Sequence, residues 1–322
     1  MRGLRFIPEE TAFDFIGRRI PAFLFSLALV LGAVGLIWKN GLNFGIDFAG
    51  GTVIEIRTPE IPDLAELRTS LNGLGLGAVS IQEFGEPTDL LIRMPQQEGD
   101  ETAQRAAIDA VRSALDGRYG EQAVDYRRTE FVGPQVGAEL KLKGLYAILF
   151  SLAGILAYVW FRFEWQFGVA SIVALAHDAI ITIGLFAFTQ MEFNLSTVAA
   201  VLTIAGYSIN VTVVVFDRIR ENLRKYKKKP LVERFNLSIN ETLTRTVMTS
   251  FTTILALIAL YVFGGEVLRS FIYALIFGVV VGTYSSIFIA SPVLLYMNVR
   301  RNKMPETDGD EEGEAAQAPQ EG

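Results

Sequence analysis

The chain has 322 residues, of which 51% are hydrophobic, and its mean hydropathy is +0.34. These values are high for a soluble protein and typical of a chain with much of its length in lipid. The absence of cysteine and the presence of one histidine, His177, exclude disulfides, thiolate sites and zinc sites that need two or more His or Cys ligands. The formal net charge of -6 is unevenly distributed, because acidic residues crowd the tail from Glu306 to Glu321.

Six apolar stretches are long enough to cross the ~30 Å hydrocarbon core of a bilayer as helices. The first one follows Arg18 and Arg19, as a signal peptide could. Its apolar run is longer than that of a signal peptide and no A-x-A cleavage site follows, so we interpret it as an uncleaved anchor. The predicted spans are residues 20–38, 144–161, 167–188, 195–216, 247–263 and 271–297.

Basic residues predict the orientation, because short cytoplasmic loops carry an excess of Lys and Arg. They cluster in residues 1–19, in a basic loop at 217–246 and at the start of the tail, 298–322. With six spans these segments share one side, so both termini are predicted to be cytoplasmic, with a disordered acidic tail at 298–322. The segment 39–143 is then extracytoplasmic. The basic run 218–229 is either this topology signal alone or a site for membrane lipids or a partner.

The segment between the first two spans has the pattern of a small folded domain. Strand-like alternation at 52–58, 78–84, 89–94 and 123–132 is interleaved with helical patterns at 63–71 and 101–115. The order βαββαβ predicts a ferredoxin-like α+β domain inserted into an α-helical polytopic membrane protein. Because this segment has no Gly-rich phosphate loop, metal cluster or nucleophile constellation, we expect binding or mechanical work, with no catalysis, cofactor, metal or nucleic acid.

Asp178 is the clearest functional candidate within the spans. It lies near the middle of the third span, where an ionisable group costs several kcal/mol and marks a functional site. We expect it to face the bundle interior, either to couple an ion or, alternatively, to tie helices together through hydroxyl groups. His177 points about 100° away on the helix, so we do not expect it to contact the same partner.

Two polar stripes are predicted on the fourth and fifth spans. Thr203, Tyr207 and Asn210 follow i, i+4, i+7 spacing on the fourth. Arg245 enters the fifth span from the cytoplasmic side and can extend to the level of Asn210. Alternatively, Arg245 snorkels to the headgroups and the hydroxyls only pack helices. The stripe on the fifth span consists of Thr242, Arg245, Thr246, Thr249, Thr252 and Thr253.

Seven motifs, in order over about residues 1–300, resemble the SecF subunits of the SecD/SecF protein translocase family, within the RND superfamily. They include Gly45, Asp47, Gly50 and Gly51 after the first span and Asp217 and Arg218 after the fourth. Together the motifs are highly specific. They read GIDFAGGT at 45–52, FVGPQVG at 131–137, HD at 177–178, GYSIN at 206–210, VVFDRIREN at 214–222, SINETLTRT at 238–246 and YVFGG at 261–265.

The resemblance implies a non-enzymatic, multi-pass subunit of the bacterial inner membrane. Such a subunit pairs with SecD, which supplies the second half of an RND-type bundle, next to the SecYEG channel and with YajC and YidC as further neighbours. It uses the proton motive force to draw preproteins outward after SecA has acted. The resemblance thus implies a role in protein transport and names its partners.

One departure from the family pattern concerns the mechanism. The family reads Ser-Ile-Asn-Asp-Thr where this chain has SINVT at 208–212, so Val211 replaces the expected membrane carboxylate. A carboxylate there would lie on the polar stripe and face Arg245, which matches the family's arginine. Three interpretations stay open: SecD supplies the titrating acid, coupling is impaired, or the coupling ion differs, with Na⁺ in place of H⁺.

Two functions therefore compete. In the first, the chain is a coupling subunit that acts through Asp178, Asn210 and Arg245, with Tyr207 and Thr249 beside them. In the second, it is a scaffold subunit without a proton site of its own, which Val211 favours. An RND-type small-molecule exporter is a third hypothesis, disfavoured because such proteins hold two six-helix halves in one chain.

Overall fold

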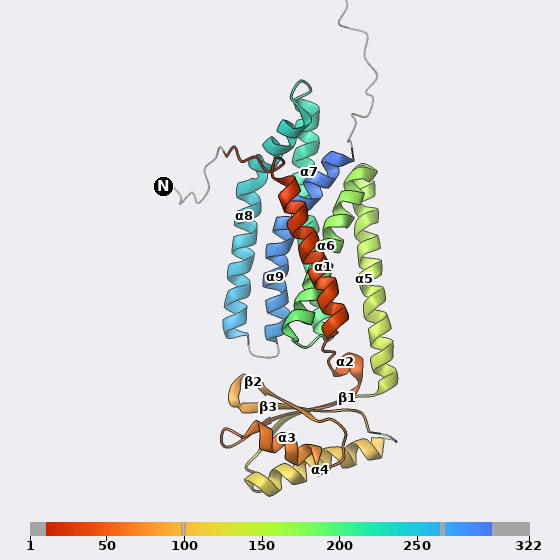
Figure 1. The fold of residues 1–322 in the computed structure, drawn as a ribbon, viewed down its shortest axis with the longest axis vertical. Coiled ribbons are helices and arrows are strands. Elements are labelled where there is room, and N and C mark those ends of the chain that lie inside the picture. Colours follow the sequence, from red (N-terminus) through yellow and green to blue (C-terminus); the bar gives the residue numbers. More distant parts are fainter. Residues whose placement is uncertain (1–10, 98, 100, 265–267, 298–322) are drawn as a thin grey trace, which may run out of the picture.

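The computed structural model describes residues 11–97, 99, 101–264 and 268–297. It consists of a bundle of long helices with a small α+β domain at one end, here called the domain end (Figure 1). Six helices among the described residues are long and apolar enough to cross a membrane, which confirms the prediction of six spans. The predicted acidic tail at 298–322 lies outside the described residues.

The bundle has a buried centre and an outer set of helices. The centre is formed by α6, α7 and the last span, whereas few side chains in the membrane-spanning parts of α1, α5 and α8 are buried. The α7–α8 connection lies at the end of the bundle opposite the domain (Figure 1). The spans are α1 (Arg19–Asn40), α5 (Pro134–Arg162), α6 (Trp165–Thr189), α7 (Leu195–Lys225), α8 (Leu231–Phe263) and α9 (Arg269–Ser285), the last continuing through the π-helical turn η2 (Ser286–Ala290) into α10 (Ser291–Tyr296).

The predicted basic loop at 217–246 is helical instead. α7 continues to Lys225 and α8 begins at Leu231, so only residues 226–230 connect them. The charged residues make this segment resemble a loop in the sequence, but their side chains form pairs between the two helices. For example, Arg218 Nε donates to Glu241 Oε2 at 2.7 Å. The 33 residues of α8 span about 50 Å, so its first turns project beyond the hydrocarbon core.

α5 also extends beyond its predicted span, because it begins at Pro134 rather than at residue 144. Its 28-residue membrane candidate, Gln135–Arg162, is about 42 Å long, so its first turns stand outside a ~30 Å core. α1 likewise continues to Asn40. The α+β domain is therefore shorter than the predicted 39–143, since both of its boundaries are helical.

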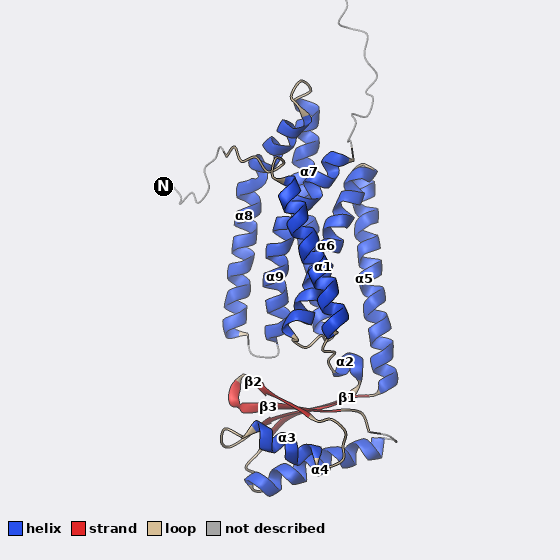
Figure 2. Cartoon of the chain, viewed as in Figure 1, coloured by secondary structure: helices blue, strands red, loops and turns tan. Residues whose placement is uncertain are grey.

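The α+β domain contains one antiparallel sheet with the strand order β2-β3-β1-β4. Its face away from the bundle is covered by α3 and α4, and a short helix, α2, precedes β1 (Figure 2). Ile54, Ile92, Leu67 and Val111 are fully buried between sheet and helices, which is the reason for the alternation in the strands. The elements are α2 (Ile46–Ala49), β1 (Gly51–Arg57), α3 (Leu64–Asn72), β2 (Ser80–Phe84), β3 (Glu86–Met94), α4 (Glu101–Tyr119) and β4 (Asp125–Val132), in the predicted order apart from α2.

α1 packs against the centre of the bundle through small residues. Ala33, one of the buried side chains of α1, meets α6 at Gly184. A Cβ added to Gly184 would lie 2.3 Å from Ala33 Cβ and 2.8 Å from its Cα. Because small residues permit this approach of two backbones, any side chain at Gly184 must push α1 away from α6.

We predict that Gly184→Ala lowers thermal stability, because overpacking of a well-packed contact costs about 1–3 kcal/mol. The measurement is the melting midpoint of the detergent-purified protein. Gly154→Ala on α5 is the matched control, since nothing lies within 4 Å of a Cβ added there. Equal midpoints for both variants would contradict the packing described.

Candidate functional site

Asp178 lies on α6 at the centre of the bundle and is 1% exposed. Its Oδ2 accepts hydrogen bonds from Ser208 Oγ on α7, at 2.6 Å, and from Ser285 Oγ on α9, at 2.8 Å. Its Oδ1 lies 3.0 Å from His177 Nδ1. One carboxyl group thus joins the three central helices. The two serines were not among the predicted site residues, because their contact with Asp178 depends on how the helices pack.

His177 contacts Asp178 itself, which was not predicted. Adjacent Cα–Cβ bonds diverge by about 100° on a helix, but Nδ1, the ring nitrogen nearer the backbone, still lies within hydrogen-bond distance of the neighbouring carboxylate. The ring also stacks on Tyr284, with 6.3 Å between centroids. Its Nε2 is buried and has no hydrogen-bond partner within the described ranges. His177 is therefore part of the Asp178 cluster.

The chemistry of this cluster suits a group that changes its protonation state. A serine hydroxyl can donate a hydrogen bond or accept one. Ser208 and Ser285 can therefore donate to a carboxylate, and after rotation one of them can accept from a carboxylic acid. Either form of the Asp178 carboxyl group therefore keeps partners on α7 and α9.

Further hydroxyl groups connect the same helices. Tyr207 donates to Ser250 Oγ on α8 at 3.0 Å, and Ser250 shares a hydrogen bond of 2.7 Å with Thr283 on α9. Thr249, a predicted site residue, donates to the carbonyl oxygen of Arg245 in its own helix at 2.8 Å. Tyr207 therefore belongs to the buried hydroxyl network, and the hydroxyl of Thr249 bonds within α8.

Asn210 and Arg245 lie on the exposed side of α7 and α8. Measured along the helices from their domain ends, Asn210 is at a depth of about 23 Å and Arg245 at about 27 Å, both within a ~30 Å core. Within the described part of the chain, neither side chain has an ion-pair or hydrogen-bond partner. Arg245 therefore lies about 3 Å inside the far boundary of the core, within reach of the headgroups, whereas Asn210 lies about 7 Å inside it.

Val211 lies on the buried side of α7, about 100° around the helix from Asn210. It is 4% exposed and shares the buried side with Ser208, because one residue step turns the helix by about 100° away from Asn210. A carboxylate at position 211 was expected to lie on the polar stripe and face Arg245, whereas the structure places this position on the buried side of α7 and Arg245 on the exposed side of α8. The predicted stripe on α8 divides in the same way, with Thr246 buried and Arg245 exposed.

The motif at 45–52 forms the junction between the domain and the bundle. Asp47 Oδ2 accepts from the N–H of Leu195, the first residue of α7, at 2.9 Å, so it caps that helix. Gly50 and Gly51 have φ values of +73° and +113°. A Cβ on Gly51 would lie 2.4 Å from the carbonyl oxygen of Met94. Glycine is therefore required where the chain enters β1.

An ion pair crosses this junction, between Arg93 on β3 and Glu192 in the connection from α6 to α7. Burial raises the pKa of Glu192, Arg93 opposes the shift and Asp47 adds to it. A Cβ on Gly45 would lie 2.3 Å from Glu192 Oε1, so the backbone of the motif at 45–52 lies close to the Glu192 side chain. This pair was not predicted from the sequence, because its members are 99 residues apart. The sequence signal that could have indicated this pair is the carboxylate of Glu192 in the short connection 189–194.

Asp217 and Arg218 lie at the end of the bundle away from the domain. Arg218 donates to Glu241 on α8 and to Glu221, at 2.7 and 2.6 Å, and Asp217 Oδ1 is 3.4 Å from Arg162 on α5. These motif residues hold helix ends together. Among the described residues there is no group of three or more His, Cys, Asp or Glu that could hold a metal ion.

Comparison with known proteins places this architecture in a family. The family model "Protein export membrane protein SecD/SecF, C-terminal" matches residues 114–300, and the model "SecD/SecF GG Motif" matches residues 35–58. The protein translocase subunit SecF of Rickettsia bellii is 48% identical over 293 residues, which cover 90% of this chain and 95% of that protein. The Rickettsia prowazekii SecF is 46% identical over 309 residues, covering 95% and 98%.

Solved structures agree. SecDF from Thermus thermophilus, a translocon-associated membrane protein, superposes with a TM-score of 0.81 at 38% identity, covering 91% of this chain. The chain spans 40% of the length of that SecDF chain. A SecDF structure in a super-membrane-facing form superposes with a TM-score of 0.65 at the same identity. Because the C-terminal model covers more than half of the chain and SecF relatives match it over almost their full length, this chain belongs to the SecD/SecF family, as a SecF.

Proposed function

We propose that this chain is a non-enzymatic subunit of a bacterial protein-export assembly, in which it pairs with SecD and couples an ion gradient to the outward movement of preproteins. The observation that carries the proposal is the unpartnered polar face with Arg245 and Asn210 at membrane depth. Lipid tails offer no hydrogen-bond partners to such a polar face, so its position in the membrane supports a second half-bundle that covers it. The extra length of the similar SecDF chain supports SecD as its source.

The proposal includes an orientation and a set of neighbours. Both termini are cytoplasmic in the inner membrane, and the α+β domain, whose strand order suits a ferredoxin-like fold, lies outside. The basic residues around the α7–α8 connection support this orientation. The family resemblance is the basis for including SecYEG, SecA, YajC and YidC among these neighbours.

Asp178 is the ion-binding group in this proposal, since Val211 cannot titrate. Its partners lie on α7 and α9, so protonation would rearrange hydrogen bonds between central helices. Burial of the cluster keeps water from competing for these bonds. The site thereby links ion occupancy to the relative positions of the helices.

The contacts at the junction can transmit a movement of the helices to the domain. α7 carries Ser208 in its middle, and the N–H of its first residue is held by Asp47. Glu192, just before α7, pairs with Arg93 of β3. A shift of α7 would therefore pull on the domain at two points.

The second candidate function is a scaffold subunit of the same assembly with no ion site. Val211 favours it, because the family's membrane carboxylate is missing from α7. In that case the Asp178 cluster serves only to hold α6, α7 and α9 together. The two candidates differ in whether export responds to a change at Asp178.

We predict that Asp178→Asn abolishes the gradient-dependent part of preprotein export, because Asn cannot exchange a proton. Export is measured in vesicles that contain this chain with SecD and SecYEG, energised by a proton or a sodium gradient to identify the ion. Ser171→Ala, on the same helix but bonded to the Phe167 carbonyl, is the control. Export indifferent to both Asp178→Asn and Arg245→Ala would support the scaffold instead.

We predict that Val211→Asp lowers the melting midpoint and adds no export activity, because the carboxylate would be placed on the buried side of α7. An unpaired buried charge is strongly destabilising. The same vesicles and melting assay test this. A large gain in export would contradict it, and would indicate that Arg245 turns inward to restore a lost couple.

The Arg93–Glu192 pair predicts a pH-dependent attachment of the domain. Because the pKa of Glu192 is raised in the docked state, docking takes up a proton and weakens as pH rises through that raised pKa. Arg93→Met removes the opposing charge, so we expect the domain to loosen at pH 8 and less at pH 5. Adding Glu192→Gln to Arg93→Met should restore docking at pH 8.

Domain position can be read from spin-label distances between cysteines introduced at Lys39 and Ser113, since the native chain has none. The control is Arg118→Met, which removes an ion pair with Glu66 inside the domain. If the double variant is as mobile as Arg93→Met at pH 8, the ion pair does not control docking.

A further inference from the structure

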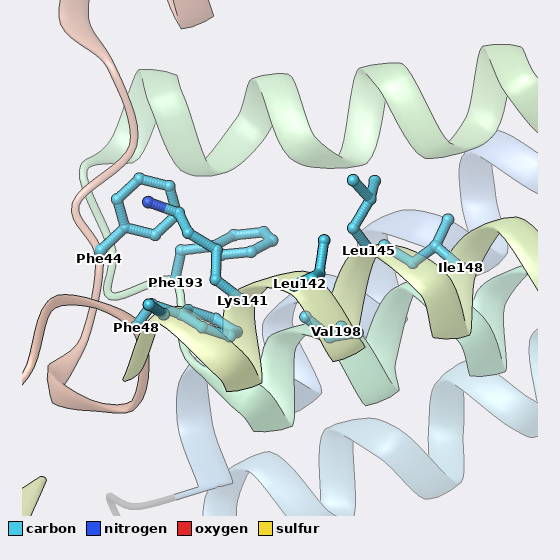
Figure 3. Close-up of a pocket in the computed structure, with 10 residues that line it drawn as sticks. Phe44, Phe48, Lys141, Leu142, Leu145, Ile148, Phe193 and Val198 are labelled. Atoms are coloured by element: carbon cyan, nitrogen blue, oxygen red, sulfur yellow. The ribbon is translucent and has the colours of Figure 1, made fainter. Parts of the chain in front are cut away.

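A groove of about 560 Å³ opens beside α5 at the domain end of the bundle (Figure 3). Its walls come from α2, α5 and α7 and from the connections near them. Such a volume is within the ~300–1,000 Å³ range of small-molecule sites. The side chains that shape it are Phe44, Phe48, Leu145, Ile148, Phe193 and Val198, all of them apolar.

The groove crosses the boundary between the headgroups and the hydrocarbon. α5 ends at Arg162, and a ~30 Å core takes about 20 residues, so the core begins near residue 142. Leu145 and Ile148 then lie at acyl-chain depth, and Lys141 lies at the level of the headgroups. An occupant must be apolar along most of its length and polar at one end.

Lys141 is the charged residue that lines the groove, at its mouth. Its Nζ lies 3.9 Å from the centroid of the Phe44 ring, and Figure 3 shows the side chain extended over that ring. No carboxylate pairs with it in the part of the chain that the structure describes. Lys143, two residues on, is instead paired with Glu139 at 2.7 Å. The mouth of the groove therefore has a positive charge that an anion can meet.

Gly144 keeps the groove open. A Cβ added to it would already contact Val198 at 3.7 Å and the Phe48 ring at 3.8 Å. A larger side chain at this position would fill the space between α5 and α7. Gly144 therefore allows a test in which the volume changes and the charge does not.

We propose that this groove binds an anionic phospholipid, with the phosphate at Lys141 and an acyl chain between α5 and α7. The outer flank of α5 here is exposed and apolar, with Leu142 and Leu145 among its residues, so lipid is the solvent beside the opening. An unpaired cation at headgroup depth supplies the charge complementarity. The bound chain would touch Phe48 and Phe193, which pack at the domain junction.

The test is native mass spectrometry of the full-length chain released from bilayers of equal phosphatidylglycerol and phosphatidylcholine with identical acyl chains. We expect one phosphatidylglycerol to be retained with about fivefold preference, the contribution of one lysine near an anionic surface. Lys141→Gln should remove the preference, and Lys143→Gln should not. Gly144→Leu should remove retention of both lipids, with the melting midpoint confirming that each variant is folded.

Two further measurements distinguish a bound phospholipid from a small phosphate compound and from a protein partner as the occupant of the groove. Glycerol phosphate, which has the headgroup without chains, should not displace the retained lipid. Equal retention of both lipids by the native chain, or equal effects of Lys141→Gln and Lys143→Gln, would overturn the proposal. Loss of the retained lipid when the chain is released together with SecD would also overturn it, because a protein would then cover the groove.

Discussion

The structure depends on a buried carboxyl group that accepts hydrogen bonds from two neighbouring helices. Asp178 costs several kcal/mol at the centre of a membrane bundle unless every lone pair facing the interior has a donor. Ser208 and Ser285 provide donors only when α7 and α9 pack against α6 in one arrangement. The carboxyl group therefore selects the packing of the three central helices, and the outer helices follow from it.

α7 connects this centre to the rest of the molecule. It contributes Ser208 and Tyr207 to the buried network, exposes Asn210, and starts at the residue that Asp47 caps. A helix is stiff along its axis, so these contacts cannot move independently. The junction motif and the membrane centre, more than a hundred residues apart in the sequence, are therefore mechanically linked in the fold.

The surface of the bundle is divided between two kinds of neighbour. The face with Arg245 and Asn210 needs a polar partner, because lipid cannot satisfy a guanidinium group. The flank of α5 is apolar down to the level of Lys141 and suits acyl chains. The short helix α2 and its aromatic contacts lie between the flank of α5 and the domain. The face proposed for the partner, the flank proposed for lipid and the junction with the domain are thus distinguishable surfaces of the bundle.

The six spans, the order of strands and helices in the domain, and the interior position of Asp178 were all predictable from sequence, because they depend on local periodicity and on the cost of burying charge. Family membership was predictable from ordered motifs. The helical ends of α5, α7 and α8 were not, since charged turns beyond the hydrocarbon resemble loops until their partners across the helix pair are known.

Contacts between distant residues needed the tertiary structure. No local sequence pattern indicates that Ser285 contacts Asp178 or that Arg93 pairs with Glu192. Nor does one indicate that Val211 lies on the buried side of its helix. The π-helical turn at 286–290, where Ser291 bonds to the carbonyl of Ser286, is another such feature. Sequence periodicity determines which residues enter the membrane, whereas the rotation of each helix about its axis is decided by packing against its neighbours, and that rotation selects which polar groups meet.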